Sequence, residues 1–130
     1  LASWVGMQAR APVEARFDGF PITLHASPLP TADSARLLVR NDSGAIVQTL
    51  SIPVSGDTYT WTGRDATNQS LPVGIYTFTV ESWSQGQLMD SKIPETFSRI
   101  EEARLEAGKT VLVLEGGATI DADQITALRQ

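Results

Sequence analysis

The most regular stretch of the sequence is Leu71-Pro72-Val73-Gly74-Ile75-Tyr76-Thr77-Phe78-Thr79-Val80. Successive side chains of a β-strand point to opposite faces, so Tyr76, Phe78 and Val80 share one face. Alternation of apolar and polar residues over this length is typical of a strand with one buried face. We therefore predict a β-sandwich strand that turns Tyr76, Phe78 and Val80 inward.

The residues just before this strand suggest how it is approached. Pro72 stiffens the entry, and we expect Gly63 and Gly74 to supply unusual φ angles. Trp61, in Trp61-Thr62-Gly63-Arg64-Asp65, is a candidate core plug. An alternative is an aromatic platform for sugars built from Trp61, Tyr76 and Trp83. Aromatic residues in alternating strands are more often buried, so we favour the core.

The rest of the chain has the same character. Residues 36–40 and 45–50 are β-rich runs around the turn Asn41-Asp42-Ser43-Gly44, which predicts a hairpin. Residues 97–106 suit a helix or a long strand, and the strand-like run 110–115 that follows favours a strand. Near the end, Asp121 or Asp123 is expected to cap a turn before a last apolar element. The whole predicts an all-β chain.

Composition limits the function. The 130 residues carry a net charge of −5 and contain no cysteine. An acidic chain is a poor ligand for nucleic acid or anionic lipid, and the lack of cysteine excludes disulfides, thiolate zinc sites and cysteine nucleophiles. No apolar run is long enough to span a bilayer. The opening residues 1–5 lack an initiator Met and a basic segment, so we expect a fragment with no visible signal peptide.

Candidate reactive groups are sparse. His25 is the only histidine and is expected to be structural. Glu101 and Glu102 are neighbours that would point to opposite faces of a strand, and the Asp121/Asp123 pair is too short a pattern for a calcium loop. Two N-glycosylation patterns, at residues 41–43 and 68–70, fall where turns are expected and carry no weight. We expect no catalytic, metal or cofactor site.

The order of motifs resembles the C-terminal region of the bacterial flagellar hook-capping protein family, also called the hook assembly scaffold. The resemblance rests on the 3–7 segment with Gly6, the turn at Gly44, the segment Trp61-Thr62-Gly63-Arg64-Asp65, and the segment that contains Leu71, Pro72, Gly74 and Tyr76. Val111 to Gly117 resembles the closing strand of the family. Thr62 departs from the usual Asp, and residues 66–70 lack the expected Gly, which leaves open how that turn closes.

The resemblance implies a fibronectin type III-like, immunoglobulin-like sandwich at residues 17–91. It would be inserted into a small Tudor-like barrel formed by residues 1–16 and 92–130. The segment 4–9 has no nearby partner and could pair with the strand at Val111. The resemblance also implies a non-enzymatic scaffold that is exported through the flagellar secretion apparatus. It would act at the tip of the growing hook as a homo-oligomer that guides hook subunits, with no nucleic acid and no membrane insertion.

Two other functions stay open from the residues. The chain could be an immunoglobulin-like module of a secreted bacterial protein that binds carbohydrate or peptide through exposed aromatic residues such as Tyr59 and Trp83. A weaker hypothesis is a small hydrolase that uses His25, although no G-x-S-x-G nucleophile motif is present.

Overall fold

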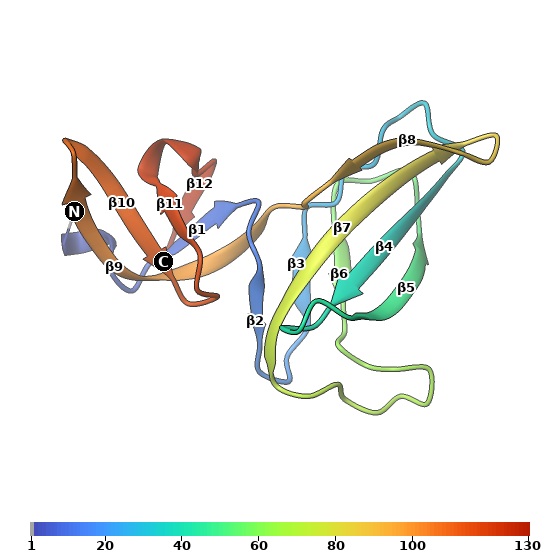
Figure 1. The fold of residues 1–130 in the computed structure, drawn as a ribbon, viewed down its shortest axis with the longest axis horizontal. Coiled ribbons are helices and arrows are strands. Elements are labelled where there is room, and N and C mark those ends of the chain that lie inside the picture. The colour runs from blue at the N-terminus through green and yellow to red at the C-terminus, as the bar shows by residue number, and fades with distance from the viewer. Residues whose placement is uncertain (1) are drawn as a thin grey trace.

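The computed structural model describes residues 2–130, which form two groups of β-strands lying side by side (Figure 1). Leu1, which belongs to the expected barrel segment 1–16, lies outside the described residues. All the long elements are strands, and only two 3-10 turns interrupt them, η1 (Ala2–Trp4) and η2 (Ala122–Gln124). The predicted all-β fold class is confirmed. Neither turn is long and apolar enough to cross a membrane as a helix.

The larger group is a sandwich of two sheets. One sheet has the order β2 (Ala15–Phe17), β7 (Gly74–Ser84), β4 (Ser34–Arg40), β5 (Ile46–Ile52), with β8 (Gln87–Lys92) paired to the second half of β7. The other sheet consists of β3 (Ile22–Leu24) and β6 (Tyr59–Trp61). The β4–β5 hairpin joins at the predicted turn.

The core of the sandwich lies between these two sheets, as the alternation of β7 predicts. Tyr76, Phe78 and Val80 are buried and belong to one hydrophobic cluster with Leu37 and Trp61. The residues between them on β7 alternate to the outer face. The prediction for this strand is confirmed.

The smaller group is one antiparallel sheet in the order β11-β10-β9-β1-β12. Its strands are β1 (Gln8–Ala11), β9 (Thr96–Glu106), β10 (Lys109–Leu114), β11 (Thr119–Asp121) and β12 (Ala127–Arg129). Residues 97–106 are therefore strand, as favoured. The two ends of the chain meet here, because β1 pairs with β12.

The predicted partner of the first segment is wrong. Residues 4–9 do not pair with the strand at Val111; β1 pairs with β9 and β12 instead. Both edges of β10 are already taken by its sequence neighbours β9 and β11, which reach it through short turns. Trp4 still packs on the same core as Leu112.

This sheet curls around its own small core and stays open along one side. The outer strands β11 and β12 follow one another through η2, and within residues 2–130 no strand pairing joins them. Asp121 caps η2, where its backbone N–H donates to Gln124 Oε1 at 2.8 Å. The expected Tudor-like barrel is thus an open one.

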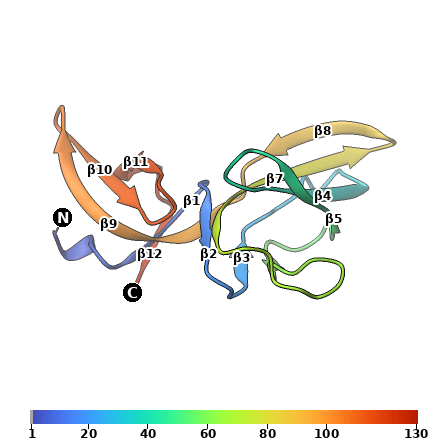
Figure 2. The ribbon, with the colours of Figure 1, turned by 60° about the horizontal axis from the view of Figure 1, so that its bottom comes forward.

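Two strand-to-strand connections join the groups. One is the 12–14 segment between β1 and β2, and the other is the 93–95 segment between β8 and β9. The two groups remain side by side when the molecule is turned (Figure 2). Cross-contacts are few: the His25 N–H donates to Glu95 O at 2.8 Å, and the Thr96 hydroxyl donates to Thr23 O at 3.2 Å.

Candidate functional site

Four aromatic rings fill the centre of the sandwich. Trp61 lies with its ring centroid 5.1 Å from Phe17, 5.2 Å from Tyr76 and 5.0 Å from Phe78. Such tilted and edge-to-face contacts are favourable for aromatic pairs. The indole N–H of Trp61 donates to Gln48 Oε1 at 2.8 Å, so its one polar group is satisfied. Trp61 is the core plug that the sequence predicts.

The same burial rules out the sugar platform. Trp61 and Tyr76 are only 1% and 3% exposed. Trp83 lies apart from them, with the Arg36 guanidinium 4.5 Å above its ring, and Tyr59 packs against the sandwich core. A stacking surface for carbohydrate needs exposed ring faces, and these residues do not provide one.

Tyr76 also holds the loop before β7. Its hydroxyl donates to Pro72 O at 2.6 Å, four residues back, as in the tyrosine corner of immunoglobulin-like sandwiches. The Leu71 N–H donates to Gly63 O at 2.8 Å and ties the start of the same loop. Burial, and then the charge of Asp42, raise the pKa of Tyr76, which keeps the hydroxyl a donor. This bond fixes the loop four residues before Tyr76 through a backbone carbonyl.

The two glycines flanking this loop behave differently. Gly63 has φ +70°, and a Cβ there would come within 2.2 Å of the Phe17 ring, so only glycine is tolerated. The expectation for Gly63 is confirmed. The expectation for Gly74 is wrong: it does not have a positive φ, because it is already in β7 and pairs with Phe17.

Two loops of the sandwich share one hydrogen-bond pattern. In the first, Asn41 Oδ1 accepts bonds from the Ser43 N–H, the Ser43 hydroxyl and the Ala45 N–H at 3.1, 2.8 and 3.1 Å. Gly44 then takes φ +84°. The side chain of the first residue therefore organises the turn, as Asn and Asp do in Asx turns.

The second loop repeats this pattern around Asp65. Asp65 Oδ1 accepts from the Thr67 N–H, the Thr67 hydroxyl and the Gln69 N–H at 2.9, 2.7 and 3.0 Å. Asn68 takes the glycine position with φ +64°, which Asn adopts more easily than most residues. This closes the turn that lacks the expected glycine. The hydrogen bond from the Thr67 hydroxyl, above all, lowers the pKa of Asp65 below 3.8.

Gly6, the remaining motif glycine, lies in the smaller group. It has φ +91° between η1 and β1, and its N–H donates to Ile100 O at 2.8 Å. It therefore directs the first residues back onto β9.

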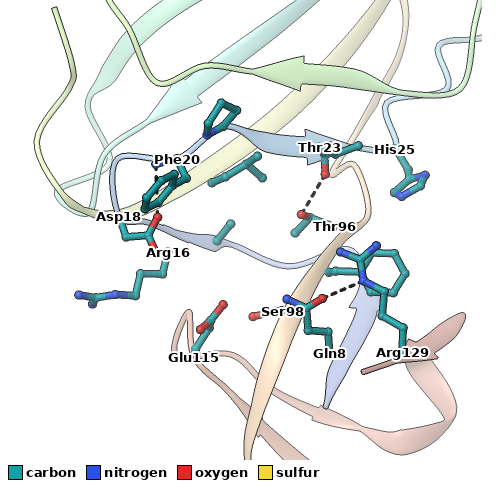
Figure 3. Close-up of a pocket in the computed structure, with 14 residues that line it drawn as sticks. Gln8, Arg16, Asp18, Phe20, Thr23, His25, Thr96, Ser98, Glu115 and Arg129 are labelled. Carbon is teal, nitrogen blue, oxygen red and sulfur yellow. Dashed lines mark hydrogen bonds between the residues drawn. The ribbon is translucent and has the colours of Figure 1, made fainter. Parts of the chain in front are cut away.

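A cleft of about 390 Å³ lies where the two groups meet (Figure 3). Phe20 and Thr23 come from the β2–β3 side, whereas Gln8, Ser98 and Arg129 come from the smaller group. Phe20 is 72% exposed. The Arg129 guanidinium stacks 3.7 Å from the Phe97 ring centroid and donates to Gln8 Oε1 at 2.8 Å.

The sequence did not point to this cleft. Its side chains come from five separate segments, and no motif links Phe20 to Arg129. The one feature of the sequence that could have indicated the cleft is the turn Asp18-Gly19-Phe20-Pro21. Its composition is typical of a surface turn, yet it contains a large apolar residue.

His25 borders the cleft from the sandwich side. Burial, and then the positive charge of Arg10, lower its pKa, while Glu95 opposes them. Glu95 is itself engaged by Arg10 Nε at 2.7 Å and by the Thr126 hydroxyl at 2.9 Å. Within residues 2–130 no hydrogen bond joins the His25 ring to a serine or a carboxylate, so the histidine has no triad geometry.

The paired carboxylates are also separated. Glu101 lies 3.7 Å from Arg99, while Glu102 lies 3.3 Å from Arg104, so the two do not converge on one site. Asp121 faces Lys109 at 3.6 Å. The part of the chain that the structure describes holds no cluster of three or more potential metal ligands. The carboxylates that the sequence singled out therefore do not gather at one place.

These features define an immunoglobulin-like β-sandwich, joined at two points to a smaller β unit and organised by packing and turns. Residues 13–86 match the family model described as the FlgD Ig-like domain. The match spans more than half of the chain, and the chain belongs to this family.

Solved structures of similar fold cover nearly the whole chain. FlgD from Pseudomonas aeruginosa is 18% identical with a TM-score of 0.80, over 98% of this chain and 99% of that one. FlgD from Xanthomonas campestris, described in connection with hook capping essential for flagellar assembly, is 18% identical with a TM-score of 0.70, over 98% and 95%. Truncated FlgD from Helicobacter pylori is 19% identical with a TM-score of 0.52, over 100% and 97%. No curated protein matches the chain.

Proposed function

We propose that this protein is a non-enzymatic scaffold that caps the growing flagellar hook and guides the polymerisation of hook subunits. The observation that carries the proposal is the family match over residues 13–86, together with a two-unit fold shared over 98% of the chain with FlgD of P. aeruginosa. The FlgD of X. campestris is described in connection with hook capping, which supports the same role for this chain.

The mechanism needs shape and reversible contact. A cap must hold incoming subunits and then release them, so weak contacts between rigid surfaces suit it better than one tight site. The sandwich supplies rigidity through its aromatic core and its pinned loops. Large apolar side chains left exposed on the described surface offer contact points: Val5, Phe20, Ile46, Val47, Val73, Leu88, Met89, Ile93 and Leu105.

We propose that the partners are flagellar hook subunits and other copies of the same protein, at the tip of the hook outside the cell. Export through the flagellar secretion apparatus belongs to the same proposal, as does the absence of nucleic acid and membrane insertion. The net charge of −5 supports partners other than nucleic acid or anionic lipid.

We also propose two domains, residues 17–91 and residues 1–16 plus 92–130. The two hydrophobic clusters support this division, since one lies within the sandwich and the other within the smaller sheet. β2 straddles the first boundary, because Ala15 already pairs with Tyr76. The motif residues Gly6, Gly44, Trp61, Gly63, Asp65, Leu71, Pro72, Gly74 and Tyr76 are proposed to act structurally in these domains.

Binding to hook subunits tests the proposal. The tagged chain is mixed with purified hook subunits and captured, in parallel with the variants Gly63→Ala and Gly74→Ala. We expect capture by the chain and by Gly74→Ala, whose added Cβ meets no atom within 4 Å, and loss of capture with Gly63→Ala, which disrupts the sandwich. A folded chain that captures no hook subunits would contradict the proposal.

A further inference from the structure

β5 has one free edge along the larger sheet of the sandwich. It is the outer strand of that sheet and pairs only with β4. Within residues 2–130, no backbone hydrogen bond links its other edge to another segment. Figures 1 and 2 both show β5 on the side of the sandwich remote from the smaller sheet. The outward N–H and C=O groups of the strand are therefore available to a further strand.

From Gln48 to Ile52 this edge lacks the usual protection against pairing. Natural edge strands are commonly blunted by charged residues, proline or bulges. The segment 45–52, Ala-Ile-Val-Gln-Thr-Leu-Ser-Ile, has no charged residue and no proline. A bulge at Val47 interrupts the start of β5, because Val39 pairs with Gln48 and Arg40 with Ile46, and the pairing is regular from Gln48 to Ile52.

The other free edge of the same sheet provides a contrast. β8 pairs only with β7, and it carries Asp90 and Lys92 within its six residues. A second strand approaching β8 would have to accommodate these charges, whereas a strand approaching β5 would meet none. The molecule thus protects one edge of the sheet and leaves the other open.

The side chains of β5 suit a second copy of the same strand. In an antiparallel pair centred on Thr49, within the regular part of β5, Gln48 would face Leu50 and Thr49 would face Thr49 of the other copy. Thr–Thr pairs are favourable across antiparallel strands. Val47, Thr49 and Ser51 are exposed, so the outer face of such a pair is accessible.

Charge also favours self-pairing at this edge over other faces of the protein. Two copies carry −5 each and repel where their carboxylates meet. On the neighbouring strand β4, the charged residues Arg36 and Arg40 pair with Ser51 and Ile46. In a continuous sheet the two copies of β4 would be about 14 Å apart, which is beyond the screening length of about 8 Å at physiological salt.

We propose that the free edge of β5 is a self-association surface, where two copies of this chain pair antiparallel about Thr49 and join their sandwiches into one continuous sheet. This inference rests on the proposed assembly function and names one of its contact surfaces. One strand pair buries less area than a stable dimer interface, which typically takes about 1,200–2,000 Å². The contact is therefore weak and reversible.

Single cysteines test this pairing directly, because the chain has no cysteine of its own. The variant Thr49→Cys is oxidised gently at about 0.1 mM chain, beside the matched control Ser91→Cys on the protected β8 edge. Directly opposite residues lie about 4.5–5.5 Å apart between Cα atoms, within the range of a disulfide. We expect Thr49→Cys to form dimers at least about tenfold faster than Ser91→Cys.

A register check and a reversal complete the test. Val47→Cys mixed with Ser51→Cys should give mixed dimers, while each alone gives few. We expect sedimentation to show concentration-dependent association of the unmodified chain at about 1 mM. Thr49→Lys should abolish this association while leaving the circular dichroism spectrum unchanged.

Three results would overturn the proposal. The first is crosslinking of Thr49→Cys no faster than that of Ser91→Cys, and the second is self-linking of Val47→Cys and of Ser51→Cys as fast as their mixture. The third is a chain that stays monomeric at about 1 mM but loses capture of hook subunits through Thr49→Lys, which would assign the edge to the hook subunit. These experiments use the chain alone or add hook subunits separately, so failure of self-pairing leaves the hook-capping proposal standing.

Discussion

The two cores of this molecule are built in different ways. The sandwich core concentrates its buried volume in Phe17, Trp61, Tyr76 and Phe78, whose rings contact one another. The smaller sheet is filled by aliphatic side chains and alanines: Ala9, Ala11, Val13, Ile100, Leu112 and Leu114. Large aromatic rings distinguish the sandwich core, whereas the smaller core is aliphatic and combines residues from the first strand with residues from the last third of the chain.

This difference affects how each part responds to change. The sandwich core depends on individual side chains and on the close approach of Gly63 to Phe17. The smaller core depends on pairing between segments far apart in the chain, such as Gln8 with Arg129. Single substitutions should therefore be more damaging in the sandwich than in the smaller sheet.

The largest effect is expected from Trp61→Ala. Removing a buried indole that contacts three rings should lower the free energy of unfolding by about 3–5 kcal/mol. Leu112→Ala in the smaller core should cost about 2–3 kcal/mol. Urea unfolding followed by circular dichroism measures both. A larger loss for Leu112→Ala would break the contrast between the cores.

The next largest effect is expected from Gly63→Ala, which should lower the free energy of unfolding by about 2–4 kcal/mol. The new Cβ clashes with Phe17, and the φ of +70° is strained for alanine. Gly74→Ala is the matched control, since its site is open and its φ is ordinary. We expect a change within about 0.5 kcal/mol for Gly74→Ala in the same urea titration. Equal losses for the two variants would show that the approach to Phe17 is unimportant.

Tyr76→Phe isolates the tyrosine corner from the packing of the ring. It keeps the aromatic contacts but removes the bond to Pro72 O, so the free energy of unfolding should fall by about 1–2 kcal/mol. Thermal unfolding by calorimetry provides the measurement. If the variant and the unmodified chain unfold at the same temperature, other contacts hold the 71–74 loop.

Ala107→Asn tests a turn of the smaller sheet. Ala107 has φ +51° and Gly108 has φ +79° in the two-residue turn between β9 and β10. Asn-Gly is preferred in such a turn, so we expect a gain of about 0.5–1 kcal/mol. Urea unfolding detects it, and a loss of stability would indicate that the alanine is not strained.

Asp65→Asn should change the stability of the protein only at acidic pH. The folded state lowers the pKa of Asp65 below its ordinary value of 3.8, so its stabilisation is present above that value and is lost as the pH falls through the lower folded pKa. The amide introduced by Asp65→Asn would preserve the acceptor, as Asn41 does in its own loop. Thermal melts from about pH 7 to about pH 2 should show less acid destabilisation for the variant. Parallel profiles would indicate that Asp65 has an ordinary pKa in the folded chain.

The sequence predicted the sandwich better than the smaller sheet. Alternation along β7 marked Tyr76, Phe78 and Val80 as core, because a large apolar residue at every second position is typical of a strand with one buried face. The partner of the first segment was missed, because alanines at positions 9 and 11 carry little pattern and the choice between β9 and β10 depends on strand order. Local motifs specify strands and turns, while pairing between chain ends is a property of the whole fold.

The candidate site shows the same limit. Alternation predicted that Tyr76 faces the core, whereas its hydrogen bond to Pro72 O was seen only in the structure. The junction cleft and the free edge of β5 arise from how separate segments assemble, and neither has a signature within one short stretch. The role of Asp65 in closing a glycine-free turn was visible only once Thr67 and Gln69 were seen to donate to it.

Hook growth in cells measures whether this protein caps the growing hook. A bacterium whose hook-capping gene is deleted is given the native protein that contains this chain, and hooks are counted by electron microscopy. We predict that hooks assemble with the unmodified protein and with Gly74→Ala, and fail with Gly63→Ala. A protein that is exported and folded but leaves the cells without hooks would contradict the account.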